Sequence, residues 1–510
     1  MPKTTRLVGP PGTGKTTKLT TWARNLGIKY GPESVMICSL TRTAAKEIAG
    51  RDTGIPDTNV GTLHAHAFRA MNAVSPRKVF GTKKHIEEFN EIAPRKFELS
   101  ESATNKEEGS RAKTNGDRVK EKIDLRIARM QPIEADEDRE FMSLYSSFKT
   151  ANGMVDFTDM LTYALESVDC PYEYVIADEA QDYSALEWAV IRKWSQQCQG
   201  AVVAGDADQC LYEWRGASVE EFFAFGDRRE VLEQSYRVPA QVHDLSEKIV
   251  HRIRAREERN YSPTDRAGAA YVLDRRLLFE AVADERGSVM LLAPVGIATR
   301  EWLDWLKKSA IPFHNPYRKE GAFAAAWNPL RRGSKGSTTA RDRVEAFLAP
   351  PWDAKKLKAW MSVMEGLPRG VKKILSETDT ALSIQGIEDI LGTYGTAAAL
   401  RGDLDWWHDN TLASKKKALH YCVQVAKTGL HNLIDEPKII VGTIHSVKGG
   451  EADTVFVSPD LGALWREAWM YGQRDPILRM MFVAATRAKD KLVMLKPTIA
   501  SATRTFQWTD

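Results

Sequence analysis

The chain has 510 residues, of which 43% are hydrophobic and 27% are charged, so its composition is that of a globular protein and not of a disordered chain. This length exceeds what one compact core usually holds, and we expect several domains. The five cysteines contain no Cys-x-x-Cys pair, and no apolar run is long enough to cross a membrane. These features exclude a disulfide scaffold and the usual zinc spacing, and they favour a reducing, cytoplasmic compartment.

The net charge of +4 is unevenly distributed. Residues 318–373 hold 13 Lys or Arg and 5 Asp or Glu, a balance of +8, so the rest of the chain sums to −4. A basic block within a slightly acidic protein can bind a phosphate backbone. A solvated helix surface would give the same composition, and both interpretations stay open.

Short apolar runs alternate with helical spacing in the N-terminal part of the chain. Thr4–Val8 predicts a strand, Gly9–Gly14 a loop and Lys15–Leu26 a helix. Further strands are expected at Val35–Leu40, Tyr174–Ala177 and Ala201–Ala204, with a helix over Thr43–Ala49. Strands that alternate with helices predict an α/β fold whose parallel sheet is covered on both faces.

Two segments interrupt this pattern with helical sequence. Pro76–Lys149 is charged and includes a polar stretch, Glu101–Asp117, that we expect to be a loop, whereas Arg318–His431 is basic and rich in tryptophan. A new α/β pattern begins near Glu230, and its expected strands are Val289–Ala293, Ile439–Thr443, Val455–Val457 and Lys491–Leu495. We therefore predict two α/β cores, each split by an insertion: residues 1–75 with 150–229 (insertion 76–149), and residues 230–317 with 432–510 (insertion 318–431).

The loop after the first predicted strand matches the phosphate-binding pattern G-x-x-x-x-G-K-[ST]. Its glycines let backbone N–H groups turn toward phosphates, Lys15 would reach the β- and γ-phosphates, and Thr16 would coordinate Mg²⁺. The positive end of the helix dipole adds to this site. The expected nucleotide-binding residues are Gly9, Pro10, Pro11, Gly12, Thr13, Gly14, Lys15, Thr16 and Thr17.

An acidic pair follows the strand predicted at Tyr174–Ala177. In a chain with a phosphate loop, Asp178 would hold Mg²⁺ through water, and Glu179 would orient or deprotonate the attacking water. Most Asp-Glu pairs are surface charges, but this pair stands directly after a buried strand. We therefore expect Asp178 and Glu179 to belong to the same site as Lys15.

Segments spread over the chain resemble, in order, the motifs of superfamily 1 DNA helicases of the UvrD/Rep/PcrA type. They are Leu40–Ala45, Gly61–His64, Asp156–Met160, Asp178–Asp182, Gly205–Ala217, Leu232–Arg237, Thr443–Glu451 and Val483–Lys489. The resemblance runs from Gly9 to Lys489. It implies two RecA-like P-loop motor domains with parallel sheets, each with a mainly helical insertion.

The resemblance also implies roles for single residues. Arg237 and Arg487 match the family's arginine fingers, Gln209 its γ-phosphate sensor, Tyr236 its adenine-stacking residue and Glu451 a ribose contact. Cations are needed there because charge spreads over the γ-phosphate during phosphoryl transfer. The expected catalytic set is Lys15, Asp178, Glu179, Gln209, Arg237 and Arg487.

Single-stranded DNA requires aromatic faces for bases and donors for phosphates. Tyr212, Trp214 and Arg215 lie between Gln209 and Arg237, so the same segment would connect the nucleotide with the DNA. The resemblance places further DNA contacts at Thr41, Thr62, His64 and His445. For the two histidines, a structural, hydrogen-bonded role stays open.

The expected function is that of a Mg²⁺- and ATP-dependent DNA helicase or translocase. By resemblance it would move 3′ to 5′ on single-stranded DNA and unwind duplex during replication, repair or recombination, in a prokaryotic or phage-infected cell. We expect single strands, single-strand/duplex junctions and replication or repair proteins as partners, no membrane, and a monomer or transient dimer. Only eight residues precede Gly9, so the family's upstream glutamine motif is missing and strict ATP preference stays open.

Three alternatives remain from the sequence. The chain could be a translocase that removes bound proteins without efficient unwinding, a non-catalytic DNA-binding regulator, or a nucleoside kinase. The kinase would leave the motifs after Gly205 unexplained, and the regulator would not need the intact catalytic set. ATP hydrolysis measured with and without single-stranded DNA separates these alternatives.

Overall fold

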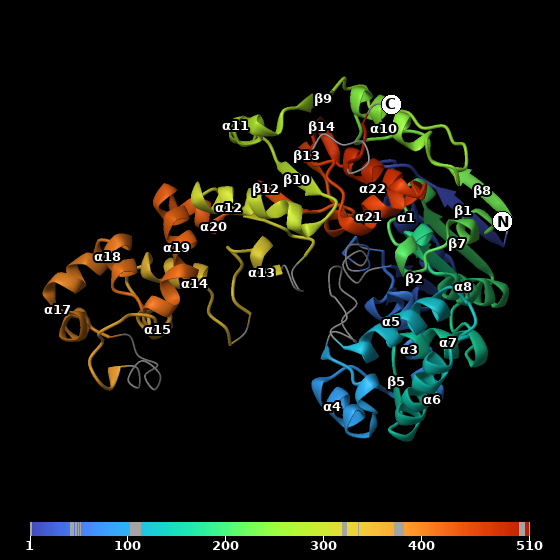
Figure 1. Cartoon of the computed structure of the whole chain (residues 1–510), viewed down its shortest axis with the longest axis horizontal. Helices are drawn as coiled ribbons and strands as arrows, with labels where there is room; N and C mark the ends of the chain where they lie inside the picture. Colours follow the sequence, from blue (N-terminus) through green and yellow to red (C-terminus); the bar gives the residue numbers. More distant parts are fainter. Residues whose placement is uncertain are drawn as a thin grey trace. The chain divides into compact units, whose positions relative to one another are not determined.

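The computed structural model describes residues 3–40, 45, 48, 50–51, 53–101, 114–318, 324–334, 336–371, 382–498 and 505–508. The chain divides into a first unit, Met1–Leu273 with Lys448–Asp510, and a second unit, Asp274–Val447 (Figure 1). Most of the helix predicted at Thr43–Ala49 lies outside the described residues, as does Thr41. No helix within the described ranges is long and apolar enough to span a bilayer.

The first unit is built on a parallel sheet with the strand order β3-β2-β6-β7-β1-β8. Its strands are β1 (Thr4–Val8), β2 (Val35–Ser39), β3 (Val60–Gly61), β6 (Tyr174–Asp178), β7 (Gly200–Gly205) and β8 (Arg228–Val231). All five residues of β2 are buried, because both faces of a parallel sheet are covered by helices. This architecture confirms the predicted α/β class.

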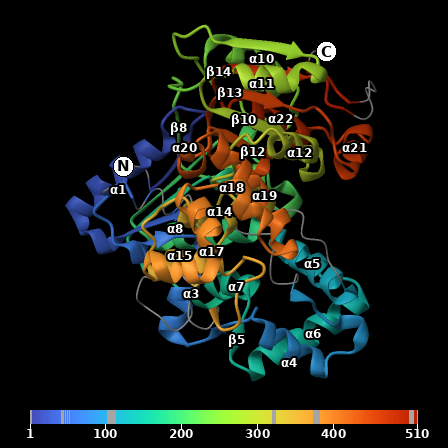
Figure 2. The same ribbon diagram turned by 90° about the vertical axis from the view of Figure 1, so that its left-hand side faces the viewer.

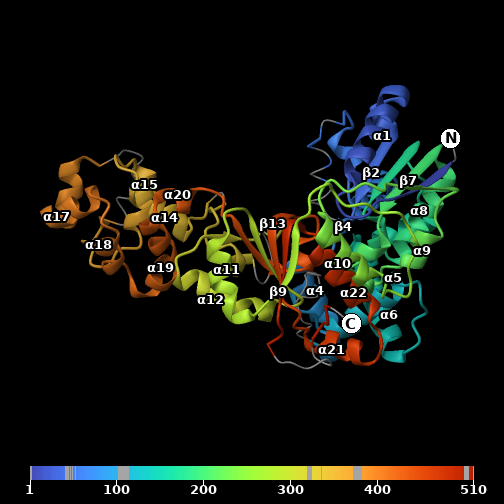
Figure 3. The same cartoon turned by 90° about the horizontal axis from the view of Figure 1, so that it is seen from above.

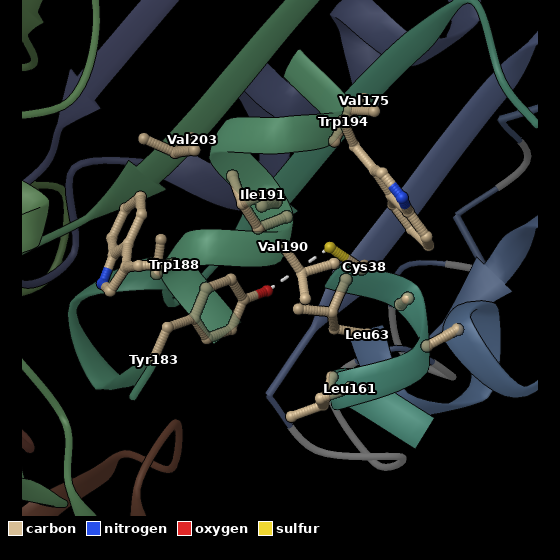
Figure 4. Close-up of a cluster of buried hydrophobic side chains, with 14 of the residues drawn as sticks. Cys38, Leu63, Leu161, Val175, Tyr183, Trp188, Val190, Ile191, Trp194 and Val203 are labelled. Atoms are coloured by element: carbon tan, nitrogen blue, oxygen red, sulfur yellow. Dashed lines mark hydrogen bonds between the residues drawn. The ribbon is translucent and has the colours of Figure 1, made fainter. Parts of the chain in front are cut away.

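Helices cover both faces of this sheet. One face carries α3 (Leu63–Val74), α7 (Phe157–Ser167) and α8 (Ala185–Gln197), whose core includes the buried Trp188 and Trp194 (Figure 4). In the same cluster, Cys38 on β2 lies 3.4 Å from the hydroxyl of Tyr183. The other face carries α1 (Lys15–Tyr30), and Figure 3 shows α1 and α8 flanking β2 and β7. The short α9 (Val219–Phe223) precedes β8.

The sequence located the strands of this sheet well. Each predicted run coincides with an observed strand, but β2 ends at Ser39, one residue before the predicted Leu40, and β6 and β7 extend the predicted runs by one residue at one end or at both. Helix α1 runs four residues beyond the predicted Leu26 and ends before Gly31, whose φ of 95° favours glycine. The helix ends there because a left-handed residue cannot continue it.

The first insertion is helical, as predicted, with α4 (Lys83–Ile92), α5 (Asn115–Ala128) and α6 (Asp136–Ala151). Aromatic rings form its core: the centroid of Phe89 lies 6.2 Å from that of Phe141 and 5.5 Å from that of Tyr145, so α4 packs on α6 (Figure 2). Two short strands that the sequence did not predict, β4 (Lys78–Val79) and β5 (Met154–Val155), pair in parallel across the ends of the insertion. Two-residue strands are too short to show alternation.

A buried group of charges lies where the insertion meets α7. The ammonium of Lys120 lies 2.9 Å from Asp124 and 3.6 Å from Asp156, and that of Lys149 lies 3.1 Å from Asp156 and 2.5 Å from Asp159. Burial opposes the ionisation of Asp156, but Lys120 and Lys149 outweigh it and hold the pKa of Asp156 well below its usual range. Burial likewise opposes the charge on Lys120, and the carboxylates of Asp124 and Asp156 reverse this and raise its pKa.

The remainder of the first unit comes from two distant parts of the chain. Helix α10 (Ala240–Val250) and β9 (Ala269–Leu273) follow β8, while β13 (Ala452–Val457), α21 (Ala463–Met470), α22 (Asp475–Ala485) and β14 (Ala488–Leu495) come from the C-terminal part. Strand β14 pairs in parallel with both β13 and β9. A second set of parallel strands therefore stands in the same unit as the phosphate loop.

The second unit has parallel strands and a helical part. Strand β12 (Ile439–Thr443) pairs with β10 (Val289–Ala293) and β11 (Phe313–His314). Its helices are α11 (Leu278–Asp284), α12 (Arg300–Lys308), α13 (Ala324–Trp327), α14 (Ala340–Phe347), α15 (Ala354–Met361), α17 (Ile384–Leu400), α18 (Leu404–Asp409), α19 (Ala413–Thr428) and α20 (Leu430–Ile434). The strands at Val289–Ala293 and Ile439–Thr443 match the prediction residue for residue.

Aromatic packing holds the helical part of the second unit together. Phe347 stacks on Trp407 with centroids 4.8 Å apart, and Trp360 contacts both Phe347 and Trp352. The buried Trp327 donates its indole N–H to Thr299. Tryptophan burial therefore accounts for the composition that marked this insertion in the sequence.

We expect Lys120→Met to destabilise the protein by roughly 3–5 kcal/mol, because the buried carboxylates of Asp124 and Asp156 would each lose a cation that faces them. Urea unfolding followed by circular dichroism measures this change. Lys84→Met is the control, since Lys84 is 81% exposed in its pair with Glu88 and should change the midpoint little. Equal shifts for the two variants would contradict a structural role of the buried charges.

Candidate active site

The phosphate loop connects the buried end of β1 to the first turn of α1. The amide of Gly9 donates to the carbonyl of Gly205 on β7 (3.0 Å), which fixes the start of the loop at the carboxyl edge of the sheet. Gly12 and Gly14 adopt φ values of 75° and 78°, and among the described residues no side chain caps α1. The first N–H groups of α1 are therefore directed to a ligand at this edge.

Lys15 folds back over the loop. Its ammonium donates to the carbonyl of Gly9 at 2.5 Å. The same side chain would collide with any Cβ at Gly9, at 2.1 Å from the Cγ of Lys15. Gly9 is therefore required by the close approach of Lys15, and Lys15 must exchange the Gly9 carbonyl for any phosphate oxygen that it binds.

Thr16 and Asp178 meet at the carboxyl edge of the sheet, as the sequence predicted. The hydroxyl of Thr16 donates to Asp178 at 3.2 Å. Burial and the neighbouring Glu179 raise the pKa of Asp178 to about 6, although Lys15 opposes this shift. Hydroxyl and carboxylate oxygens suit Mg²⁺, and no cluster of three or more His, Cys, Asp or Glu in the described parts of the chain could hold a metal. A magnesium ion here would keep several water or phosphate ligands.

Glu179 occupies a strained position beside Asp178. Its φ of 54° and ψ of 34° are left-handed, which is unusual for a residue with a side chain. Its carboxylate accepts a hydrogen bond from Gln181 (2.7 Å) and lies 3.1 Å from the ammonium of Lys448. Burial would raise its pKa, but Lys448 and Lys15 together lower it to about 2. Glu179 is thus ionised, and Gln181 and Lys448 fix the orientation of its carboxylate.

Lys448 lies within the motif segment Thr443–Glu451, but the sequence did not predict it as a site residue. It pairs with Asp182 as well as with Glu179, and these two carboxylates outweigh its burial and raise its pKa. A lysine inside Thr443–Glu451 was a visible signal. Its partners Asp182 and Glu179 lie more than 260 residues earlier, so the sequence could not show that Lys448 neutralises the acidic edge of the sheet.

Gln209 and Arg487 lie in direct contact. The guanidinium of Arg487 donates to the side-chain oxygen of Gln209 at 3.1 Å, while the amide of Gln209 donates to Asp206 at 2.7 Å. Arg487 is 2% exposed, and burial together with the nearby Arg237 lowers its pKa to about 9. Asp206, which the sequence did not single out, orients the amide of Gln209 toward Arg487.

The segment that holds Tyr236 and Arg237 packs directly on the phosphate loop. The amide of Tyr236 donates to the carbonyl of Gly12 (2.9 Å), and the hydroxyl of Ser235 donates to the carbonyl of Pro11 (2.9 Å). Tyr236 is 76% exposed, so its side chain is accessible to a ligand, and Arg237 donates to Glu451 at 2.7 Å. The predicted adenine, ribose and arginine-finger residues therefore cluster beside Gly12.

The predicted DNA-binding aromatics lie on the segment that follows Gln209. The centroids of Tyr212 and Trp214 are 6.4 Å apart, and the guanidinium of Arg215 lies 5.7 Å from the Tyr212 centroid and 6.0 Å from the Trp214 centroid. Trp214 is 43% exposed. An exposed indole beside a guanidinium has the chemistry of a base-stacking platform.

The other predicted DNA contacts occupy different environments. Thr62 caps α3 by accepting a hydrogen bond from the amide of Ala65 (3.2 Å), and His64 lies 3.8 Å from Glu187. His445 belongs to the second unit, where it is buried. Thr62 thus has a structural role that is sufficient to explain it, and a DNA contact at these three residues stays a prediction.

Comparisons with known proteins show which helicases the chain resembles. Residues 2–229 match the model of the UvrD/REP helicase N-terminal domain. A probable DNA helicase II homolog of Mycoplasma capricolum is 25% identical over 305 residues, covering 53% of this chain and 42% of that protein. One from Rickettsia felis is 22% identical over 370 residues, covering 60% and 54%. The chain thus spans about half the length of these curated relatives.

Among solved structures, an arterivirus nonstructural protein 10 helicase in complex with DNA is 12% identical, with a TM-score of 0.33 over 98% of this chain and 62% of that one. This likeness is too low to support an argument. The match of residues 2–229 carries the resemblance, because it spans the phosphate loop, Asp178, Glu179 and Gln209. The chain is similar to UvrD/Rep/PcrA-type helicases of superfamily 1.

Proposed function

We propose that the chain is an ATP- and Mg²⁺-dependent DNA helicase or translocase that moves 3′ to 5′ on single-stranded DNA and unwinds duplex. One observation carries the proposal: the contact between Arg487 and Gln209 lies at one end of the segment whose other end presents Tyr212, Trp214 and Arg215. Gln209, proposed to sense the nucleotide, and Tyr212 and Trp214, proposed to stack on bases, therefore lie within six residues of one another in the chain. A non-catalytic DNA-binding protein would not need this connection.

In this proposal, each site residue of the first unit has one role in ATP hydrolysis. Lys15 and the N–H groups of α1 would bind phosphates, and Thr16 with Asp178 would hold Mg²⁺, which supplies charge stabilisation when bound. Glu179, ionised and aimed by Gln181 and Lys448, would orient the attacking water and accept its proton at the carboxylate. Arg237 and Arg487 would supply the remaining positive charge.

The partners that we propose are single strands and single-strand/duplex junctions, with replication or repair proteins beyond them. The four-domain division of the sequence stays part of this proposal: two motor cores, with insertions at 76–149 and 318–431. The basic block of residues 318–373 supports a duplex contact. Lys355 and Lys358 on α15 are exposed, whereas the neighbouring Trp352 and Trp360 are buried.

Gly12→Ala should weaken nucleotide binding at least tenfold, about 1.4 kcal/mol. A Cβ at Gly12 would lie 2.5 Å from the Cβ of Arg237 and 2.9 Å from the hydroxyl of Ser235, so the loop would separate from that segment. Titration with a fluorescent ATP analogue measures the affinity. The control is Gly31→Ala, where φ is also positive but no described atom lies within 4 Å. Equal affinities in the two variants would refute the packing argument.

Glu179→Gln should lower DNA-stimulated ATP hydrolysis by about a hundredfold or more, because general-base catalysis typically contributes that much. Affinities for the ATP analogue and for a single strand should persist, since the substitution removes only a carboxylate charge. Glu140→Gln, which changes an exposed carboxylate paired with Lys96, is the matched control and should hydrolyse at the parent rate. Near-parent turnover by Glu179→Gln would show that another group activates water.

Replacing Lys355 and Lys358 by Glu should weaken binding to a forked duplex and flatten its salt dependence, because each duplex phosphate contact contributes a slope near −0.9. Binding to a short single strand should be retained. Lys415→Glu with Lys417→Glu makes the same charge change at exposed positions on α19 and serves as the control. Salt titrations of both substrates decide: equal losses on fork and single strand, or none, would contradict a duplex contact.

A further inference from the structure

Arg479 on α22 is a buried cation that the proposed hydrolysis does not use. It is 1% exposed, forms an ion pair with Glu213, and donates its second guanidinium nitrogen to the carbonyl of Ala255 at 2.7 Å. Its Nε has no hydrogen-bond partner among the described residues. Glu213 is therefore the group that neutralises Arg479 inside the first unit.

This ion pair is the second contact between the same two segments. Arg487, just after the end of α22, holds Gln209, and Arg479 holds Glu213. The arginines stand eight positions apart, and their partners stand four positions apart, with Gln209 at the end of one short 3₁₀ turn and Glu213 at the start of the next. Arg479 on α22 and Arg487 just after this helix thus hold the two ends of the segment 209–213.

Glu213 stands between the two aromatic residues proposed to stack on DNA. Tyr212 precedes it and Trp214 follows it in the turn Glu213–Arg215, and the backbone carbonyl of Glu213 also accepts a hydrogen bond from Arg129 at 3.4 Å. A shift of the Glu213 carboxylate therefore moves the backbone on which both rings are mounted.

The surroundings of the ion pair disfavour the negative charge of Glu213, which Arg479 compensates. Burial raises the pKa of Glu213, the carboxylates of Asp475, Glu220 and Asp182 raise it further, and Arg479 is the opposing charge. A cavity of about 430 Å³ adjoins the pair and is lined also by Arg129 and Ser218. Cys210 and Leu211 within the segment are buried, whereas the cavity beside the ion pair leaves room for the turn Glu213–Arg215 to move.

We propose that the Glu213–Arg479 ion pair is a pivot that positions Tyr212 and Trp214 according to the state of the Arg487–Gln209 contact. The inference rests on the proposed function. When Arg487 leaves Gln209 for a phosphate, the contact at Glu213 stays, so the segment rotates about it and does not detach. Glu213 and Arg479 are positioning residues: they touch neither the nucleotide nor the bases.

The test uses Glu213→Gln in the full chain and compares two couplings with the parent. The first is the ratio of ATP hydrolysis with single-stranded DNA to that without it. The second is the ratio of single-strand affinities with and without a non-hydrolysable ATP analogue. Both should fall toward one, a loss of about tenfold if the coupling has an ordinary size. Glu257→Gln is the matched control, since it removes the partner of the buried Arg6 away from this segment and should keep both ratios.

A second variant guards against misfolding. Glu213→Ala combined with Arg479→Met removes the pair without leaving a buried charge, and it should show the same loss of coupling with a parent-like melting temperature. If the parent is stimulated by DNA and either well-folded variant keeps both ratios, the pivot is wrong and the proposed function stands. If the parent shows no DNA-stimulated hydrolysis, the proposed function itself fails.

Discussion

Buried carboxylates at the carboxyl edge of the first sheet are the constraint on which the rest of the first unit depends. Asp178, Asp182, Asp206 and Asp208 are each 2–3% exposed. An ionised group removed from water costs several kcal/mol unless an opposite charge and hydrogen bonds compensate it. The edge of the sheet can therefore exist only with cations packed on it.

Those cations come from distant parts of the chain. Arg256 and Arg259 pair with Asp208, and Lys448 pairs with Asp182 across 266 residues of sequence. The C-terminal segment of the first unit is thus an electrostatic component of the edge that carries the phosphate loop. This pairing explains why residues 448–510 belong to the same compact unit as residues 1–273.

The sequence was informative wherever short-range rules decide the structure. The strand, glycine loop and helix of Thr4–Tyr30 follow from apolar burial, left-handed glycines and the helix dipole, and each acts within a few residues. The same locality made Thr16 and Asp178 predictable, because Asp178 ends β6 and Thr16 lies in the first turn of α1, after the loop that follows β1.

Side-chain partners across the chain could not be predicted in this way. Apart from its place in the segment Thr443–Glu451, nothing near Lys448 in sequence distinguishes it from a surface lysine, and nothing near Arg479 marks it as buried; both depend on partners 266 residues away. Thr62 shows the opposite case, since its place before an apolar helix already allowed a capping role that needs no DNA. A motif can identify a residue, but only its contacts in the folded protein show which role the side chain has.

The cations of the candidate site share one property that bears on how it would work. Lys15 is bound to the Gly9 carbonyl, Arg237 to Glu451 and Arg487 to Gln209. Each must leave a protein oxygen to reach a phosphate oxygen, so the free energy of phosphate binding is a difference between two sets of charge-assisted hydrogen bonds. The released oxygens belong to the loop, to Glu451 and to the segment that ends at Trp214. An exchange of partners at the phosphates would therefore change the restraints on the segment that we propose to contact DNA, whatever the size of the net binding energy.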